Sequence, residues 1–599
     1  MSSLSEEDKF EIGQHFVFGF HGLEPSEDVI TLIREYKIGN IILMKRNIQN
    51  FNQVRKLVHS LQTIAKEAGH RHPLLIGIDQ ENGHVSPFSN PNGEAGTQFP
   101  GATTVTSIWE YGVAERIARA TANELKMAGI NWVFSPVADV NSNSNNSVIG
   151  ARSYGKDPNR VAGAASMVAR GLSQAGRGVA ACAKHFPGQG DTQIGSHLAL
   201  PVVNKTYDDL GKTELVPFRR LDVDSIMIGH ISLPALRVFP SDETDICPAS
   251  LSKVAITHLL RYRLSFNGVV VTDCLEKKAI SDTAYGPGIE RGAVLALQAG
   301  ADIAMACHTF DSQVGSIKAV YASVGAGELS MADMRVSGER VAWMKTKYAR
   351  EWEINANKFE WVTEKEWKEL KQENRLLSLR MYAAAMTWAL PDNPHPIPRE
   401  LIDDTRRSDI RSKFKPLDHW SIATIYTPAK EIIDLAIDDP SSDALDMNDG
   451  VQDVGILRKE GGVERNMAGE SYIAFGNAIA RRAGRFNVAG QFVYSASNYA
   501  STRLLFEKVV IVCLRNAHQP SGAWQIKFLK RVLLYAPKST RILVVVTYGQ
   551  YDLSGQDADT RFVVEMLKER GEPVLYAFEF TKEALEAAAD ALYGCKDWL

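Results

Sequence analysis

Six cysteines, at positions 182, 247, 274, 307, 513 and 595, are too few and too scattered in this chain to build a framework of disulfide bonds. None of them stands in the close C-x-x-C pairs that hold a structural zinc ion. The chain of 599 residues is therefore expected to fold around ordinary hydrophobic cores, and its length calls for at least two domains.

The chain also lacks a surplus of basic residues and a long apolar run. Its formal net charge of −4 argues against nucleic acid or an anionic membrane as the main partner. No apolar stretch is long enough to cross a bilayer, and the N-terminus, MSSLSEEDKFEIG, does not have the basic and then apolar order of a signal peptide. We therefore expect a cytoplasmic protein with no membrane partner, and we leave its oligomeric state open.

Short apolar runs recur through the first 310 residues. They span 16–21, 40–46, 74–79, 132–139, 179–185, 225–230, 268–273 and 302–308. Segments with the periodicity of amphipathic helices, such as VRKLVHSLQTIAKEAG, lie between them. Continuously apolar strands that alternate with helices are typical of buried parallel sheets, so eight such units predict a (β/α)8 barrel of the TIM type.

Every one of these runs ends in a charged residue or a histidine. These residues are His21, Arg46, Asp79, Asp139, His185, His230, Asp273 and His308. The carboxyl ends of all strands of a parallel barrel meet at one mouth, which is where active sites lie. One polar strand end means little, because every strand must stop, but eight of them indicate an active site at this mouth.

A second α/β domain is expected after the barrel. A charged helical region covers roughly 331–386, and the stretch PDNPHPIP (391–398) has the composition of an extended linker. Apolar strands such as KVVIVCLRN and helices such as TKEALEAAADALYG then alternate. We predict a barrel domain with trailing helices over 1–386, a linker over 387–404 and a C-terminal α/β sandwich over 405–599.

Asp273 is the first candidate for chemistry. It ends the strand VVVTD, whose packing would hold the carboxylate rigidly, and rigid placement suits a nucleophile that attacks a sugar. A structural aspartate that caps the following helix is the alternative for this residue.

Other polar side chains near the mouth could clasp the hydroxyl and amide groups of a sugar. They are Asp79, Arg152, Lys184, His185 and His230. A surface ion pair is the alternative for Arg152, and a solvated loop edge is the alternative for Lys184 and His185. The loop KHFPGQGDTQIGSH (184–197) has neither the order of a nucleotide P-loop nor the spacing of a metal site, so no metal or other cofactor is expected. Its glycines suit a mobile loop that carries His197 over the substrate.

This loop is accompanied by further motifs: GIDQENGHV (77–85), FSPVADVNSN (134–143), NSVIGARSYG (146–155), MIGHISLPAL (227–236) and GVVVTD (268–273). In this order the motifs resemble glycoside hydrolase family 3, and most closely its β-N-acetylglucosaminidase branch, over roughly residues 10–310. The second domain resembles the family's C-terminal α/β sandwich more loosely. The resemblance implies a retaining, exo-acting enzyme that removes N-acetylglucosamine from the non-reducing end of chitin-type or peptidoglycan-type oligosaccharides.

The resemblance also implies roles for single residues. Asp273 matches the nucleophile that forms a glycosyl-enzyme intermediate, and His197 matches the general acid/base. The residues that match those holding the N-acetylglucosamine unit are Asp79, Arg152, Lys184 and His185.

Two positions depart from the family pattern. The family has an aspartate two residues before the catalytic histidine, where it orients the ring, and this sequence has Gly195. The family's QEGGRV is QENGHV in this chain, so His84 replaces an arginine. We hypothesise that Asp191, in the same loop, replaces the orienting aspartate, because Gly195 permits backbone conformations that other residues avoid. A partner from elsewhere at the mouth, or none, is the alternative.

Three other functions stay open. The first is a phosphorylase, because a histidine tolerates an incoming phosphate dianion better than a carboxylate base would. The second is a sugar-binding protein in which Gly195 has removed catalysis. The third is a β-glucosidase of the same family, against which the KHFPG loop argues. In each case the expected partner is a small-molecule sugar, and for the leading function it is an oligosaccharide that contains N-acetylglucosamine.

Overall fold

The structure is a computed structural model that describes residues 4–89, 95–108, 110, 112–146, 148–192, 200–238, 248–282, 286–350, 352, 363–389, 417, 423–428, 456–459, 462–465, 470–483 and 488–594. These residues form two compact units, the barrel unit and the C-terminal unit.

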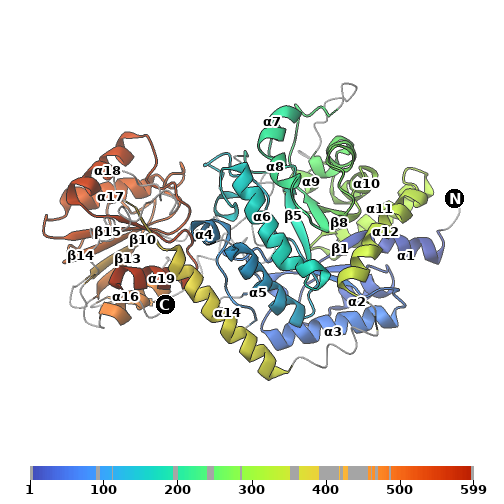
Figure 1. Ribbon diagram of the computed structural model, residues 1–599, viewed down its shortest axis with the longest axis horizontal. Helices are drawn as coiled ribbons and strands as arrows, with labels where there is room; N and C mark the ends of the chain where they lie inside the picture. The colour runs from blue at the N-terminus through green and yellow to red at the C-terminus, as the bar shows by residue number, and fades with distance from the viewer. Residues whose placement is uncertain are drawn as a thin grey trace. The chain divides into compact units, whose positions relative to one another are not determined.

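Eight parallel strands close into a barrel in the barrel unit (Figure 1). They are β1 (Phe16–Phe18), β2 (Asn40–Leu43), β3 (Leu75–Ile78), β4 (Trp132–Val133), β5 (Ala180–Phe186), β6 (Ser225–Ile228), β7 (Val269–Cys274) and β8 (Ile303–Ala306). Their residues are buried throughout, because the barrel interior covers one face and the helices cover the other. The eight strands coincide with the eight apolar runs, and the predicted TIM-type barrel is confirmed.

Helices follow the strands and surround them. In the barrel unit they are α1 (Glu6–Gly13), α2 (Glu27–Arg34), α3 (Phe51–Glu67), α5 (Val113–Met127), α6 (Pro158–Ser173), α7 (Tyr207–Lys212), α8 (Leu215–Phe218), the π-type helix η5 (Val254–Arg263), α9 (Lys278–Ser281), α10 (Ile289–Gln298), α11 (Phe310–Gly325) and α12 (Met331–Tyr348). Several begin at a capping side chain: Ser26, Asn50 and Asp157 accept hydrogen bonds from the first backbone N–H groups of α2, α3 and α6.

The barrel interior is filled at the amino ends of its strands. Residues such as Val17, Leu75 and Trp132 form one buried cluster with Met344 and Tyr348 of α12. Polar side chains lie at this end as well, among them the buried Asp302, which accepts hydrogen bonds from Arg261 and Arg340.

The C-terminal unit contains an open sheet of six strands in the order β13–β10–β14–β15–β16–β9. The strands are β9 (Thr387–Ala389), β10 (Ala423–Pro428), β13 (Val488–Tyr494), β14 (Val509–Leu514), β15 (Arg541–Val546) and β16 (Val574–Tyr576), and all pair in parallel except β9. A separate hairpin joins β11 (Ile456–Lys459) and β12 (Gly462–Arg465).

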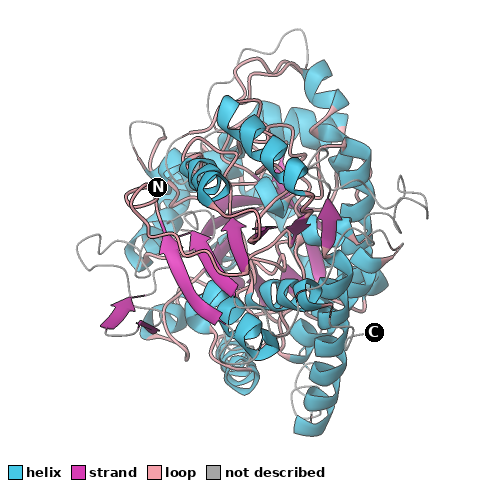
Figure 2. Cartoon of the chain, turned by 90° about the vertical axis from the view of Figure 1, so that its left-hand side faces the viewer, coloured by secondary structure: helices cyan, strands magenta, loops and turns pink. Residues whose placement is uncertain are grey.

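Helices cover both faces of this sheet (Figures 1 and 2). One face packs against α16 (Glu470–Ala483) and α19 (Lys582–Tyr593), and the other against α17 (Trp524–Tyr535) and α18 (Ala558–Arg570). Ile425 and Cys513 point to the first face, whereas Tyr426 and Leu514 point to the second, as the alternation of side chains along a strand requires. The predicted fold class, a barrel followed by a separate α/β domain, is confirmed.

The division between the units differs from a simple cut at the predicted linker. Residues up to 99 and 112–375 form the barrel unit, whereas 100–111, with α4 (Ala102–Ser107), and the described residues from 376 onward form the C-terminal unit. The helix α14 (Glu364–Ala385) runs through the boundary. Residues 387–389, expected in the linker, form β9 and pair with β16, and 390–404 lie outside the described residues.

Glu579 anchors residues 100–111 within the C-terminal unit. Its buried carboxylate accepts hydrogen bonds from the Gly101 backbone N–H at 2.9 Å, the Thr104 hydroxyl at 2.9 Å and the Tyr382 hydroxyl at 2.8 Å. Burial raises the pKa of this carboxyl group, although these hydrogen bonds oppose the shift.

Among the described helices, none is both long and apolar enough to cross a membrane.

Candidate active site

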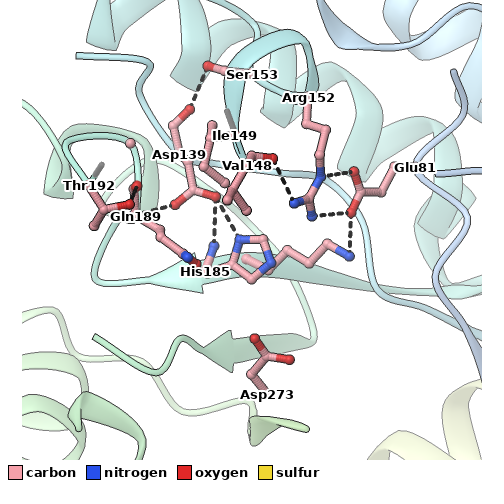
Figure 3. A network of polar contacts seen from close by, with 12 residues as sticks. Glu81, Asp139, Val148, Ile149, Arg152, Ser153, His185, Gln189, Thr192 and Asp273 are labelled. Carbon is pink, nitrogen blue, oxygen red and sulfur yellow. Dashed lines mark hydrogen bonds and ion pairs between the residues drawn. The ribbon is translucent and has the colours of Figure 1, made fainter. Parts of the chain in front are cut away.

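Asp139, in the irregular segment after β4, and His185, in β5, form the centre of a polar network at the barrel mouth (Figure 3). The His185 imidazole Nδ1 lies 2.7 Å from Asp139 Oδ2, and the His185 backbone N–H donates to the same oxygen at 3.2 Å. The other carboxylate oxygen accepts from the backbone N–H of Gln189 at 2.6 Å. Asp139 therefore fixes both the ring of His185 and the start of the loop that follows it.

A buried carboxylate, Glu81, organises the second part of the network. Arg152 donates to it through Nη2 at 2.7 Å and Nε at 2.9 Å, and Lys184 Nζ lies 2.6 Å from it. Lys184 also donates to Asp79 at 2.5 Å. Burial would raise the pKa of Glu81, but the two cations outweigh it and lower that pKa to about 2. The same carboxylates raise the pKa of Lys184 against the effect of its burial.

Asp79 and Arg152 differ in what they present to the mouth. The Asp79 side chain is 31% exposed, which leaves its carboxylate accessible to a ligand. Arg152 is only 10% exposed, and its third nitrogen, Nη1, donates to the Val148 carbonyl oxygen at 3.2 Å. Arg152 and Lys184 thus form an ion cluster with Glu81 and Asp79, a different arrangement from the isolated surface ion pair considered for Arg152.

Asp273 is the penultimate residue of β7 and faces this network from the other side of the mouth, with its carboxylate directed toward His185 (Figure 3). The Cys274 backbone N–H donates to Oδ1 at 2.7 Å, and Lys277 Nζ donates to Oδ2 at 2.6 Å. Burial would raise the pKa of Asp273, but Lys277, His230 and His185 outweigh it and hold that pKa well below the usual range. The carboxylate is therefore ionised and fixed in orientation.

His230 supports the strand end that carries Asp273. It is fully buried, with Nδ1 at 2.7 Å from the Ser250 hydroxyl and Nε2 at 2.8 Å from the Cys274 carbonyl oxygen. Burial lowers the pKa of its imidazole to about 4, so the ring is neutral near pH 7. Both ring nitrogens are used within the protein.

Close packing accounts for two of the three glycines in the loop after His185. Gly188 has a φ of +126° and packs against the Glu214 side chain, and a Cβ atom at Gly190 would lie 1.7 Å from the Val140 carbonyl oxygen. These two glycines therefore allow close packing of the loop. The sequence pattern instead predicts glycines that make the loop mobile so that it can carry His197 over the substrate. Gly195 and His197 lie outside the described residues.

Asp191 is the last charged residue of the described part of this loop. Its Oδ2 lies 3.2 Å from Lys205 Nζ, and Lys205 also contacts the buried Glu214 at 2.7 Å. The Asp191 side chain is 34% exposed.

Three of the predicted strand ends lie apart from this network. His21 is exposed, whereas Arg46 Nη1 and His308 Nδ1 are 3.2 Å apart. The ligand atoms of Cys274, Cys307 and His308 lie within 4.8 Å of one another and are a donor set that a soft metal ion could use. The Arg46 guanidinium occupies one nitrogen of that histidine, so a metal ion there would have a cation as its neighbour.

Sequence reasoning missed Glu81 and Lys277. Glu81 is part of the quoted motif GIDQENGHV, but nothing local distinguishes it from a solvated acidic residue. Lys277 follows Asp273 by four residues, a spacing that could have suggested a contact. Together, the site offers an ionised and immobilised carboxylate opposite a cluster of hydrogen-bonding groups, which suits nucleophilic attack on a bound polar substrate.

Known proteins resemble the chain over the barrel and over its whole length. β-Hexosaminidase A of Pseudoalteromonas piscicida is 38% identical over 289 residues, which are 46% of this chain and 47% of that protein. A β-hexosaminidase of Thiobacillus denitrificans is 34% identical over 293 residues, 48% of this chain and 76% of that protein. The chain thus matches about half the length of the first relative and three quarters of the second.

Two solved structures match almost the entire chain. A GH3 β-N-acetylglucosaminidase from Paenibacillus sp. superimposes with a TM-score of 0.74 at 28% identity, covering 99% of this chain and 97% of that one. A fungal multi-domain GH3 β-N-acetylglucosaminidase with a GCN5-related glucosamine N-acetyltransferase region gives a TM-score of 0.76 at 30% identity, covering 98% of this chain and 59% of that one.

The family model described as the glycosyl hydrolase family 3 N terminal domain matches residues 9–344, which span the whole barrel. The barrel strands, the order of the motifs and this match agree, and the chain belongs to glycosyl hydrolase family 3.

Proposed function

We propose that the protein is a retaining exo-β-N-acetylglucosaminidase that releases N-acetylglucosamine from the non-reducing end of chitin-type or related oligosaccharides. One observation carries the proposal: the carboxylate of Asp273 stands at the barrel mouth, ionised and held by Lys277 and the Cys274 backbone N–H. A nucleophile for glycoside hydrolysis has to be ionised and aimed at the anomeric carbon, and an ionised carboxylate with a fixed orientation supports this role. The names of the β-hexosaminidase relatives support the choice of sugar.

In this proposal the sugar lies between Asp273 and the ion cluster. The exposed carboxylate of Asp79 accepts hydrogen bonds from sugar hydroxyl groups, and Lys184 and His185 donate to the sugar from positions fixed by Glu81 and Asp139. Arg152 holds Glu81 and through it the position of Lys184. His230, whose ring nitrogens bond within the protein, acts on the substrate through the strand end of Asp273.

The proposed reaction proceeds in two displacement steps, in which Asp273 is the nucleophile and His197 is the general acid and then the general base. Asp273 attacks the anomeric carbon and forms a glycosyl ester, while His197 gives its proton to the departing glycosidic oxygen. His197 then takes a proton from water, whose oxygen attacks the same carbon and releases Asp273. Two displacements restore the original anomeric configuration.

Assay of 4-nitrophenyl N-acetyl-β-glucosaminide tests the role of Asp273. The Asp273→Asn variant should retain less than about a thousandth of wild-type turnover, because the amide cannot act as the nucleophile. Asp208→Asn, a change on the exposed surface of α7, is the matched control and should be fully active. Equal activity of Asp273→Asn and wild type would reject Asp273 as the nucleophile.

The same assay in phosphate and in a non-nucleophilic buffer tests the hydrolytic outcome. Hydrolysis predicts N-acetylglucosamine as the product in both buffers. Sugar 1-phosphate as the main product in phosphate would instead identify a phosphorylase, sugar binding without turnover would identify a binding protein, and a strong preference for plain glucosides would identify a β-glucosidase.

Asp191 remains our candidate for orienting His197. If it has this role, Asp191→Ala should lower turnover and move the alkaline limb of the pH profile to lower pH, because a neighbouring carboxylate raises the pKa of an imidazole. Gly195→Asp should then improve the wild-type profile little. A silent Asp191→Ala variant together with a faster Gly195→Asp variant would assign the role elsewhere.

A further inference from the structure

The sheet of the C-terminal unit has the strand order of a doubly wound fold. In chain order, β10 is followed by β13 on one side and then by β14, β15 and β16 on the other. This is the order 2-1-3-4-5, in which the direction of the connections reverses between the first and third strands. Open α/β sheets bind ligands at the carboxyl ends of the strands at such a point, which in this sheet lies between β10 and β14.

Unsatisfied polar atoms occur on both strands that flank this position. Arg515 and Asn516 directly follow β14 and are 4% and 3% exposed. Within the described part of the chain, Nε and Nη2 of Arg515 and Nδ2 of Asn516 have no hydrogen-bond partner. On the neighbouring strand, the buried hydroxyl of Thr427 likewise has none. A buried guanidinium is costly unless it is paired, so these donors call for an acceptor.

The two unsatisfied nitrogens of Arg515 lie on one edge of the guanidinium. Nε and Nη2 form the fork that binds two oxygens of a carboxylate or phosphate at once. Arg152 uses this same edge in the barrel unit, where Nε and Nη2 bind the two oxygens of Glu81. Arg515 therefore presents the geometry of a bidentate oxyanion contact, with no carboxylate of the described residues in it.

Arg515 is held in place by groups other than an anion. Its guanidinium carbon lies 3.6 Å from the centroid of the Phe580 ring. Gln525 accepts from the Arg515 backbone N–H at 2.9 Å and donates to its carbonyl oxygen at 2.6 Å. This fixation means that the donors are positioned before any ligand arrives, which lowers the entropic cost of binding.

Neighbouring polar groups continue the same face of the sheet. Cys513 of β14 packs with α16 and α19, so by alternation Arg515 emerges on the side of α16. There, the Tyr472 hydroxyl of α16 lies 2.6 Å from the Thr547 hydroxyl, directly after β15. The carboxyl ends of three adjacent strands thus contribute polar side chains to one region.

We propose that Thr427, Arg515 and Asn516 form a binding site for the oxyanion of a small ligand, a carboxylate or a phosphate. The ligand's two oxygens take the fork of Arg515, and the Asn516 amide donates to the same group. The site consists of residues of the C-terminal unit, and none of them is among the residues assigned to glycoside cleavage. It gives this unit a ligand of its own.

Asp552 provides the competing explanation. One of its carboxylate oxygens lies 2.7 Å from His518 Nδ1, and the other has no partner among the described residues. If Arg515 is neutralised by Asp552 instead of by a ligand, Arg515→Met should destabilise the protein and added anions should have no specific effect.

The test uses the full chain and three matched solutions of sodium chloride, sodium acetate and sodium phosphate at one ionic strength. The unfolding midpoint and titration calorimetry are measured for wild type and Arg515→Met. The matched control is Arg541→Met, which removes an arginine paired with Glu572 at the amino end of β15, the opposite edge of the sheet. Because Arg541 donates hydrogen bonds to Glu572, it has a partner within the protein and is not expected to bind an added anion.

Phosphate or acetate should raise the midpoint of wild type and of Arg541→Met by several degrees over chloride, and should raise that of Arg515→Met much less. The anion that raises the midpoint, phosphate or acetate, shows whether the ligand group is a phosphate or a carboxylate. Without an added anion, Arg515→Met should be at least as stable as wild type, because it removes an unpaired buried charge. Equal shifts of the midpoint in wild type and Arg515→Met would identify a non-specific salt effect and overturn the proposal. The absence of a shift in all three proteins would also overturn it.

Arg515→Lys keeps the test decisive if Arg515→Met does not fold. A lysine retains the charge but cannot make the bidentate contact. The affinity measured by calorimetry for the anion that stabilises wild type should therefore fall by at least about tenfold. An unchanged affinity would place the anion elsewhere.

Discussion

Glu81 shows how one buried side chain can set the positions of several others. It lies between Arg152 and Lys184 and holds these two long cationic side chains at the mouth. Without it, these cations would be buried with only the exposed Asp79 as a carboxylate partner. In the proposed function, Glu81 therefore acts on substrate binding through the residues that it holds, and its loss is expected to lower stability and to raise KM.

The pH dependence of stability tests this role of Glu81. Its pKa in the folded protein is depressed from 4.5 to about 2, so its stabilising effect is complete above pH 4.5 and is lost as the pH falls toward 2. Such a shift corresponds to about 3 kcal/mol. Glu81→Gln should lower the stability of the barrel unit by about this amount at pH 7, and the difference from wild type should be about 1 kcal/mol smaller at pH 4. Thermal unfolding across pH measures it; a difference that does not change with pH would contradict the ion cluster.

Lys277 is expected to set the pKa of Asp273, the proposed nucleophile. Lys277→Met removes the cation 2.6 Å from Asp273, so the pKa of Asp273 should rise and the acid limb of kcat/KM should move to higher pH by about one unit or more. Lys277→Arg should restore most of the wild-type profile. A loss of activity with an unshifted acid limb would mean that Lys277 has only a structural role.

The site residues that sequence reasoning found share a property, and so do those it missed. Asp273 and His185 stand at the ends of apolar strands, so a linear pattern marks them and the barrel topology brings them to one mouth. Glu81 was not recognised because its partners, Arg152 and Lys184, are 71 and 103 residues away in the chain (152 − 81 and 184 − 81). An ion pair between loops leaves no periodic signal, and only the fold reveals it.

At the level of elements, the strands of the barrel were predicted well because burial on both faces makes them continuously apolar. Their ends were predicted less well: the run 132–139 contains only two residues of β4, and the remainder is an irregular segment that carries Asp139. An apolar run indicates that a segment is buried, and a segment can stay buried after its hydrogen bonds to the neighbouring strands have ended.

The packing of the loop after β5 leads to a prediction for its glycines. In Gly190→Ala the new Cβ would overlap the Val140 carbonyl oxygen, so the backbone next to Gln189 must move. We expect a loss of about 2–3 kcal/mol in stability and reduced turnover, because Gln189 and His185 share the carboxylate of Asp139. Denaturant unfolding and the glycosidase assay measure the two effects.

Gly163→Ala is the matched control for this change. Gly163 is exposed in α6, and a Cβ atom added there would have no heavy atom of its surroundings within 4 Å, so alanine should raise stability by about 0.5–1 kcal/mol through helix propensity. Equal behaviour of the two alanine variants would show that the loop yields to the added methyl group.

For the molecule as a whole, the two-part architecture was predictable from composition and alternation, but the membership of residues 100–111 in the C-terminal unit was not. The predicted linker is Pro-rich and marks a boundary by its composition. Residues 100–111 lie in the middle of the barrel sequence and contain no such marker. Their place is set by the hydrogen bonds that Gly101 and Thr104 give to Glu579, a contact that no local pattern encodes.

Glu579→Ala tests this contact in the full chain. The change leaves the partly buried N–H of Gly101 and the buried hydroxyl groups of Thr104 and Tyr382 without their acceptor, and we expect the C-terminal unit to lose about 3 kcal/mol of stability. Glu569→Ala, on the exposed surface of α18, is the control and should change stability by less than about 0.5 kcal/mol. Hydrogen exchange of β16 and α4 locates the effect; protection unchanged in both would contradict the anchoring role.

The link between Gly101 and Glu579 also has a consequence for biosynthesis. The two residues are 478 positions apart, so a ribosome that adds about 5–20 residues per second makes the second about 25–95 s after the first. During that interval the barrel segment that follows α4 is synthesised, while α4 itself stays without its eventual neighbours. Slow translation of the last third of the message would lengthen this interval, and chaperone binding to the segment around α4 is the expected cellular response.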